Sequence, residues 1–166
     1  MRYVFATLAL LLTALVQTSV MPAFPIFGVS PNLVLVLLVC WTVVRGRQEA
    51  MVVIPIGGLC LSLLGSQPVG VALLAAVPVL LLSEIGTLNL TPSKLLLALA
   101  VAFLSSLIYE AVLLVALRLE GDSVGWLAAL VRVVIPTSIV NVVFTLPLYW
   151  LVWLRSGGLG KIRSYV

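Results

Sequence analysis

Long apolar runs, broken only by short polar or proline-containing junctions, dominate this chain and restrict what it can fold into. Lipid offers peptide groups no hydrogen bonds, so runs that cross it must be helical. The chain has 166 residues, of which 63% are hydrophobic and 8% charged, and this leaves too little polar sequence for a separate soluble domain. The sequence therefore predicts one all-α integral membrane domain.

The apolar runs divide the chain into six predicted transmembrane helices in one bundle. Their approximate bounds are residues 3–20, 32–44, 51–64, 69–83, 94–119 and 126–153. The second to fourth are shorter than the roughly 20 residues that span a bilayer, so we expect them to recruit loop residues or to be wrapped by longer neighbours. Between them, residues 45–49 are predicted to form a polar turn, and Pro31 the first turn of the second helix. The first run lacks a clear cleavage site, which favours an uncleaved helix over a signal peptide.

Basic residues lie at alternate junctions between the runs, and this pattern predicts the orientation. Basic side chains that flank membrane spans stay in the cytoplasm. With both termini cytoplasmic, seven of the nine basic residues lie on that side: Arg2, Arg45, Arg47, Lys94, Arg155, Lys161 and Arg163. Of these, Arg45, Arg47, Arg155, Lys161 and Arg163 are available either to cytoplasmic partners or to the membrane surface. The net charge of +4 follows from this topology, and no basic cluster is dense enough to indicate nucleic-acid binding.

Two ionisable residues, Glu110 and Arg132, are predicted to lie well inside the membrane. A charge there costs about 2.5–3.5 kcal/mol, so each needs a partner or a wet cavity. On a rise of about 1.5 Å per residue, their depths differ by only about 4.5 Å. The hypothesis is an intramembrane ion pair between the fifth and sixth helices. The alternative is that each side chain reaches the interface or a water pocket separately.

Other polar and small residues indicate contacts between helices. Asn141, between Pro136 and Pro147, is predicted to make an interhelical polar contact or to satisfy carbonyls that the prolines free. Gly57, Gly58 and Ser62 give the third helix a small-residue face for close packing.

Catalytic chemistry has no support in the sequence. There is no histidine, no metal-ligand cluster and no phosphate-binding loop, so the chain is predicted to be no enzyme and to need no cofactor. Cys40 and Cys60 both fall within apolar runs, where buried small hydrophobes are favoured over a disulfide or metal site.

An ordered set of motifs runs through most of the chain. Residues 31–33 read Pro-Asn-Leu, residues 45–50 Arg-Gly-Arg-Gln-Glu-Ala, residues 57–59 Gly-Gly-Leu and residues 65–70 Gly-Ser-Gln-Pro-Val-Gly. Together with Asn141 and the flanking prolines of the last helix, this set resembles the bacterial rod-shape-determining MreD family. One departure is Ser62, where family members often carry an acidic residue.

The resemblance implies a non-enzymatic scaffold of the elongasome in the bacterial cytoplasmic (inner) membrane. Its implied partner is the single-span protein MreC, and directly or indirectly RodA, its penicillin-binding transpeptidase and MreB, besides membrane lipid. Lateral peptidoglycan synthesis and rod shape would depend on it. The resemblance also implies a fold similar to the substrate-binding subunits of energy-coupling-factor transporters.

That similarity supplies an alternative function, a small-molecule, vitamin-like binding subunit of a membrane transporter. Such a subunit needs a cavity with convergent polar groups, and the candidates are Gln17, Glu110, Arg132 and Asn141.

Overall fold

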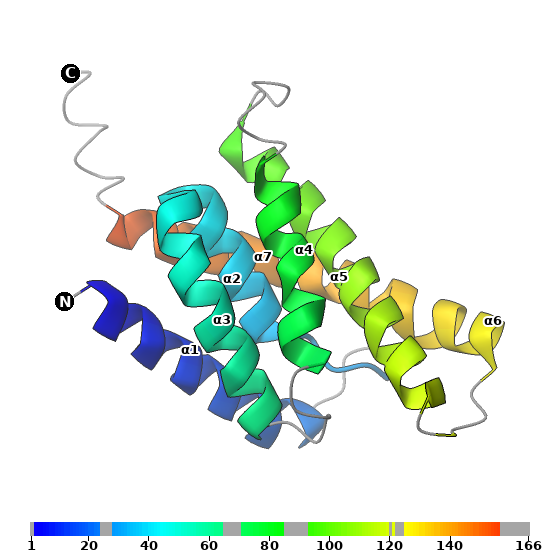
Figure 1. The fold of residues 1–166 in the computed structure, drawn as a ribbon. Coiled ribbons are helices and arrows are strands. Elements are labelled where there is room, and N and C mark those ends of the chain that lie inside the picture. The colour runs from blue at the N-terminus through cyan, green and yellow to red at the C-terminus, as the bar shows by residue number, and fades with distance from the viewer. Residues whose placement is uncertain are drawn as a thin grey trace.

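The computed structural model describes residues 2–23, 28–64, 71–84, 93–119, 121 and 125–156, nearly all of them helical. The elements are α1 (Arg2–Ser19), the 3-10 turn η1 (Met21–Ala23), α2 (Leu33–Arg45), α3 (Arg47–Leu64), α4 (Val71–Glu84), α5 (Lys94–Leu119), α6 (Trp126–Ala129), the π-helical turn η3 (Leu130–Val134) and α7 (Ile135–Arg155). The last three follow one another without a break, so six helical rods form the bundle (Figure 1). The all-α class predicted from the sequence is confirmed for the described residues.

The central element of the bundle is α2. Every side chain from Leu33 to Val43 is buried, because α1, α3, α4, α5 and α7 all pack around it. Its sequence is apolar all round, as expected for a helix without an exposed face. At 13 residues it is only about 20 Å long, and its neighbours enclose it on all sides.

The junction between α2 and α3 is shorter than the polar turn predicted over residues 45–49. Arg45 ends α2, Arg47 begins α3, and Gly46 alone lies between them with φ +90° and ψ 176°. The prediction was wrong for residues 47–49 because Arg, Gln and Glu are good helix formers. The actual break needs only the one residue type that adopts this backbone conformation readily.

Substituting Gly46 tests this explanation of the junction. Gly46→Ala is expected to lower the free energy of unfolding by about 1–3 kcal/mol, since this backbone region is nearly restricted to glycine. A Cβ at Gly46 would meet nothing within 4 Å, so a loss cannot come from a clash. Chemical unfolding in detergent micelles measures the change, with Gln48→Ala on the exposed side of the same turn as a control. Equal stabilities for the two variants would contradict the backbone explanation.

Close packing of α3 on α2 depends on Gly57. A Cβ built there would lie 2.8 Å from Leu38 Cδ2 and 3.0 Å from Leu38 Cδ1, so no larger residue fits without displacing Leu38. Gly58 and Ser62 are also buried on α3. The small-residue face predicted on this helix therefore lies within the bundle.

The C-terminal helix contains a wide turn that the sequence did not predict. In η3 the backbone widens to the π form, and the Ile135 N–H donates to the carbonyl of Leu130, five residues back. Pro136 follows directly and has no N–H for the carbonyl of Arg132. A π turn is one way in which a helix accommodates such a loss. The helix then continues to Arg155, two residues past the predicted end.

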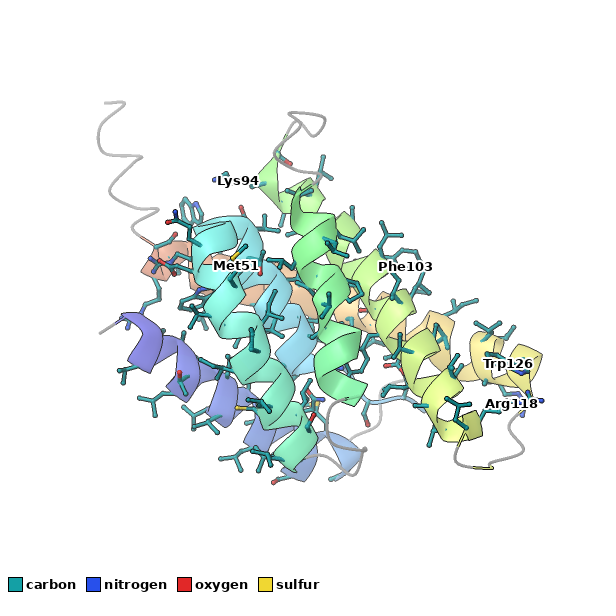
Figure 2. The ribbon with its side chains drawn as sticks, viewed as in Figure 1. Met51, Lys94, Phe103, Arg118 and Trp126 are labelled. Carbon is teal, nitrogen blue, oxygen red and sulfur yellow. The ribbon has the colours of Figure 1, made fainter. Side chains whose placement is uncertain are left out.

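Two opposite ends of the bundle can be recognised. The start of α1, the α2–α3 junction, the start of α5 and the end of α7 lie toward one end in Figure 1. The end of α5 and the start of α6 lie at the other, where Arg118 and Trp126 are neighbours in Figure 2.

Candidate functional site

A cluster of polar side chains surrounds the buried start of α2. It comprises Gln17 of α1, Asn32 before α2, Ser106 and Tyr109 of α5, and Asn141 of α7, and we call it the α2-start cluster. Asn32, Ser106, Tyr109 and Asn141 are at most 5% exposed. Four segments far apart in sequence thus bring their polar groups to one place.

Asn141 joins three of these segments. Its Oδ1 accepts from the Asn32 backbone N–H at 2.8 Å, and its Nδ2 donates to Ser106 Oγ at 2.9 Å. The structure therefore places Asn141 as a polar contact between helices.

The same cluster caps α2. Asn32 Oδ1 accepts from the Leu35 N–H at 3.1 Å, and Gln17 Oε1 accepts from the Val34 N–H at 3.0 Å. The Tyr109 side chain lies beside the Asn32 side chain. The first N–H groups of a helix have no partner within it, and a helix that begins among apolar side chains cannot use water instead. The arrangement supplies those acceptors, which is a structural role.

The hydroxyls of α7 bond to their own helix. Ser138 donates to the Val134 carbonyl at 2.8 Å, and Thr145 donates to the Asn141 carbonyl at 2.8 Å. These carbonyls are not the ones four residues before Pro136 and Pro147, and the Asn141 amide leaves its helix altogether. Asn141 therefore makes a contact between helices, and neither its amide nor the Ser138 and Thr145 hydroxyls bond to the carbonyls that the prolines free.

Glu110 and Arg132 do not form the hypothesised ion pair in this structure. Glu110 is partly buried on α5, whereas Arg132 is exposed on η3. Both residues belong to the described part of the chain, and no ion pair joins them there. The physical reason is the phase of the helix, because η3 buries Val134 and turns Arg132 to the outside.

A double-mutant cycle tests whether Glu110 and Arg132 form an ion pair or act independently. We expect the losses in stability from Glu110→Gln and Arg132→Gln to add within about 0.5 kcal/mol, as independent sites do. Unfolding of both single variants and of the double variant in one detergent gives the coupling energy. A coupling energy above about 1 kcal/mol would instead support the ion pair.

A second candidate site lies at the end of the bundle that contains the start of α1. The Arg45 Nη2 donates to the backbone carbonyl of Arg155 at 3.3 Å, and the Arg45 guanidinium carbon is 5.5 Å from the centre of the Trp41 ring. The Arg155 guanidinium carbon lies 4.3 Å from the centre of the Phe5 ring. We call Arg45 and Arg155 the arginine pair. Of the other basic residues predicted on this side, Lys161 and Arg163 lie outside the described residues, and the Arg47 side chain is likewise not described.

Residues suited to metal chemistry do not gather in the described ranges. No group of three or more His, Cys, Asp or Glu is found among them. Cys40 and Cys60 are both free and buried, and Cys40 Sγ lies 3.7 Å from the carbonyl oxygen of Thr145.

Comparisons with known protein families, with curated proteins and with solved structures found no match.

Sequence reasoning had named Asn141 and Gln17 but missed Asn32, Ser106 and Tyr109 as members of the cluster. For Asn32 a signal existed, since Asn is a preferred N-cap residue and directly precedes an apolar run. Ser106 is a small residue within a long apolar run, and nothing in the sequence distinguishes Tyr109 from an apolar core residue.

Proposed function

We propose that this chain is a multi-pass protein of the bacterial cytoplasmic membrane, with six spanning helices and both termini in the cytoplasm. Two helical stretches, Lys94–Leu119 and Leu130–Arg155, are long and apolar enough to cross a membrane by length and composition. Only 33% of the most apolar window in each is buried within the protein. The core helix of a soluble protein would be mostly buried, so the low share supports lipid contact.

The outer surface gives independent support. Large apolar side chains are exposed on α1, α3, α5 and α7, among them Leu12 (63%), Leu63 (74%) and Val143 (58%). Met51 (47%) and Phe103 (37%), labelled in Figure 2, are also exposed. Soluble monomers rarely expose contiguous apolar patches above a few hundred Å², whereas a lipid environment stabilises such a surface.

Within that membrane we propose a scaffold of the elongasome, which binds MreC and supports lateral peptidoglycan synthesis and rod shape. The observation that carries the proposal is that interior polar groups hydrogen-bond to the protein's own backbone. Gln17 and Asn141, two of the four residues considered for a small-molecule pocket, are engaged in capping α2. Because these interior polar groups bond to the protein's own backbone and the exterior is apolar, the bundle is suited to bind other membrane helices. The motif resemblance to the MreD family supplies the identity of the partner.

Co-purification tests this function. The chain is expressed with the single-span coiled-coil partner, extracted in mild detergent and purified through a tag on the chain alone. We expect the partner to elute with it at a fixed ratio, and depletion of the chain in its host to cause loss of rod shape. An unrelated single-span protein expressed at the same level is the control and should be absent.

The transporter alternative predicts a different outcome of the same preparation. A vitamin-binding subunit would show thermal stabilisation by its ligand and would co-purify with an ATPase. Either result, together with the absence of the single-span partner, would overturn the scaffold proposal.

A further inference from the structure

The arginine pair joins the C-terminal ends of α2 and α7. Arg45 and Arg155 are 110 positions apart in sequence, yet the Arg45 guanidinium reaches the Arg155 carbonyl at 3.3 Å. Each guanidinium also lies against an aromatic ring, Trp41 for Arg45 and Phe5 for Arg155. These contacts limit the freedom of both side chains, so the positive charge is positioned rather than spread over a mobile surface.

Within the described residues no carboxylate forms an ion pair with either guanidinium. The closest acidic residue along the chain is Glu49, whose Oε2 accepts from the Trp41 indole Nε1–H at 3.2 Å. A cation near a helix C-terminus is favourable, and this accounts for one arginine on each helix. It does not account for the contact between the Arg45 guanidinium and the Arg155 backbone.

One buried donor of the pair has no acceptor among the described residues. It is the Nε–H of Arg45. Buried donors in native structures are nearly always satisfied, and an exception needs an explanation such as an absent ion or ligand. A group that satisfies this donor must accept a hydrogen bond, and an anion would also match the charge of the guanidinium.

We infer that the arginine pair binds the phosphate of an anionic phospholipid headgroup. A planar guanidinium matches two phosphate oxygens at once, which an ammonium cannot do. The site lies at the ends of the helices, where headgroups meet a bundle embedded in lipid, and the exposed apolar side of α1 beside Phe5 is available to an acyl chain. The inference rests on the membrane location proposed above, but not on the scaffold function.

Lipid retention in nanodiscs tests the inference. The full chain is reconstituted with phosphatidylcholine alone or with an equal share of phosphatidylglycerol, and lipids that remain bound after release into the gas phase are counted by native mass spectrometry. We expect at least a tenfold preference for phosphatidylglycerol. Arg45→Gln and Arg155→Gln should each reduce the preference about fivefold or more, and Arg45→Lys should restore only part of it.

Arg118 offers a matched control. Its guanidinium carbon lies 5.3 Å from the centre of the Trp126 ring, at the other end of the bundle, and it is also near a helix C-terminus. Arg118→Gln should keep the full preference. Equal retention of the two lipids by the unmodified chain, or an equal loss in all three Gln variants, would overturn the inference, and the first outcome needs no variant to fold.

Two further arms separate the sources of phosphate and the kinds of partner. Glycerol phosphate or inorganic phosphate at about 10 mM, added to phosphatidylcholine nanodiscs, should not reproduce the stabilisation that phosphatidylglycerol gives, and full reproduction would show a free-anion site instead. Arginine variants that lose the single-span partner but keep the lipid preference would assign the pair to an acidic protein segment and overturn the lipid site. Failure to enter nanodiscs at all would instead contradict the membrane location.

Discussion

Asn141→Ala is expected to lower the free energy of unfolding by about 2–4 kcal/mol, among the largest effects of any single substitution in this chain. It removes the acceptor of the Asn32 N–H and the donor to Ser106 Oγ, and both groups stay buried. A buried polar group without a partner costs about 1–3 kcal/mol. Reversible unfolding in mixed detergent micelles measures the loss.

Two companion variants define what the Asn141 result means. Val143→Ala, two residues along α7 and 58% exposed, should change stability by no more than about 0.5 kcal/mol. In a Ser106→Ala background, Asn141→Ala should cost less than in the unmodified chain, since one of its bonds is already absent. If Asn141→Ala cost no more than Val143→Ala, the α2-start cluster would have no part in stability.

Gly57→Leu is the second substitution with a large expected effect, a loss of about 1–3 kcal/mol from overpacking. Even a Cβ at this position would lie 2.8 Å from Leu38 Cδ2, and Leu38 is fully buried on α2. The leucine side chain therefore has to force α2 and α3 apart. The same micelle unfolding experiment reports the change.

The compensating change for Gly57→Leu lies on the facing helix. Leu38→Ala removes the atoms that clash, so the double variant should be more stable than the sum of the two single losses predicts. Leu63→Ala on the exposed side of α3 is the control and should be nearly neutral. Strict additivity of Gly57→Leu and Leu38→Ala would show that the two residues do not share the contact.

Helices that are long and apolar were predictable from sequence to within a few residues. The span predicted over 94–119 coincides with α5, because its apolar run is uninterrupted and polar residues flank it. The start of α3 was not predicted because two signals conflict at residues 47–49. Their polar side chains indicate a turn, whereas their helix propensity favours a helix. The π turn η3 was invisible, since its five residues carry no composition signal.

The candidate sites were predictable only where one residue carries the signal alone. Asn141 is an amide within an apolar run, and this is sufficient to predict a polar partner. Its partner, the backbone N–H of Asn32, is 109 positions away, and only the packing of α7 on α2 brings the two together. The pairing of Glu110 with Arg132 relied on depth alone, and depth does not determine which side of the helix a residue occupies.

The enclosure of α2 has a consequence for how the chain is made. In the membrane topology proposed above, helices insert in the order of synthesis, so α2 would enter lipid long before α7 exists. Until then the backbone N–H of Asn32, directly before α2, would lack its acceptor, Asn141 Oδ1. The last helix thus completes the hydrogen bonding at the start of the second. A nascent chain that ends before α7 would leave the Asn32 N–H without this acceptor. A membrane quality-control protease that recognises such defects would distinguish unfinished chains from finished ones at this point.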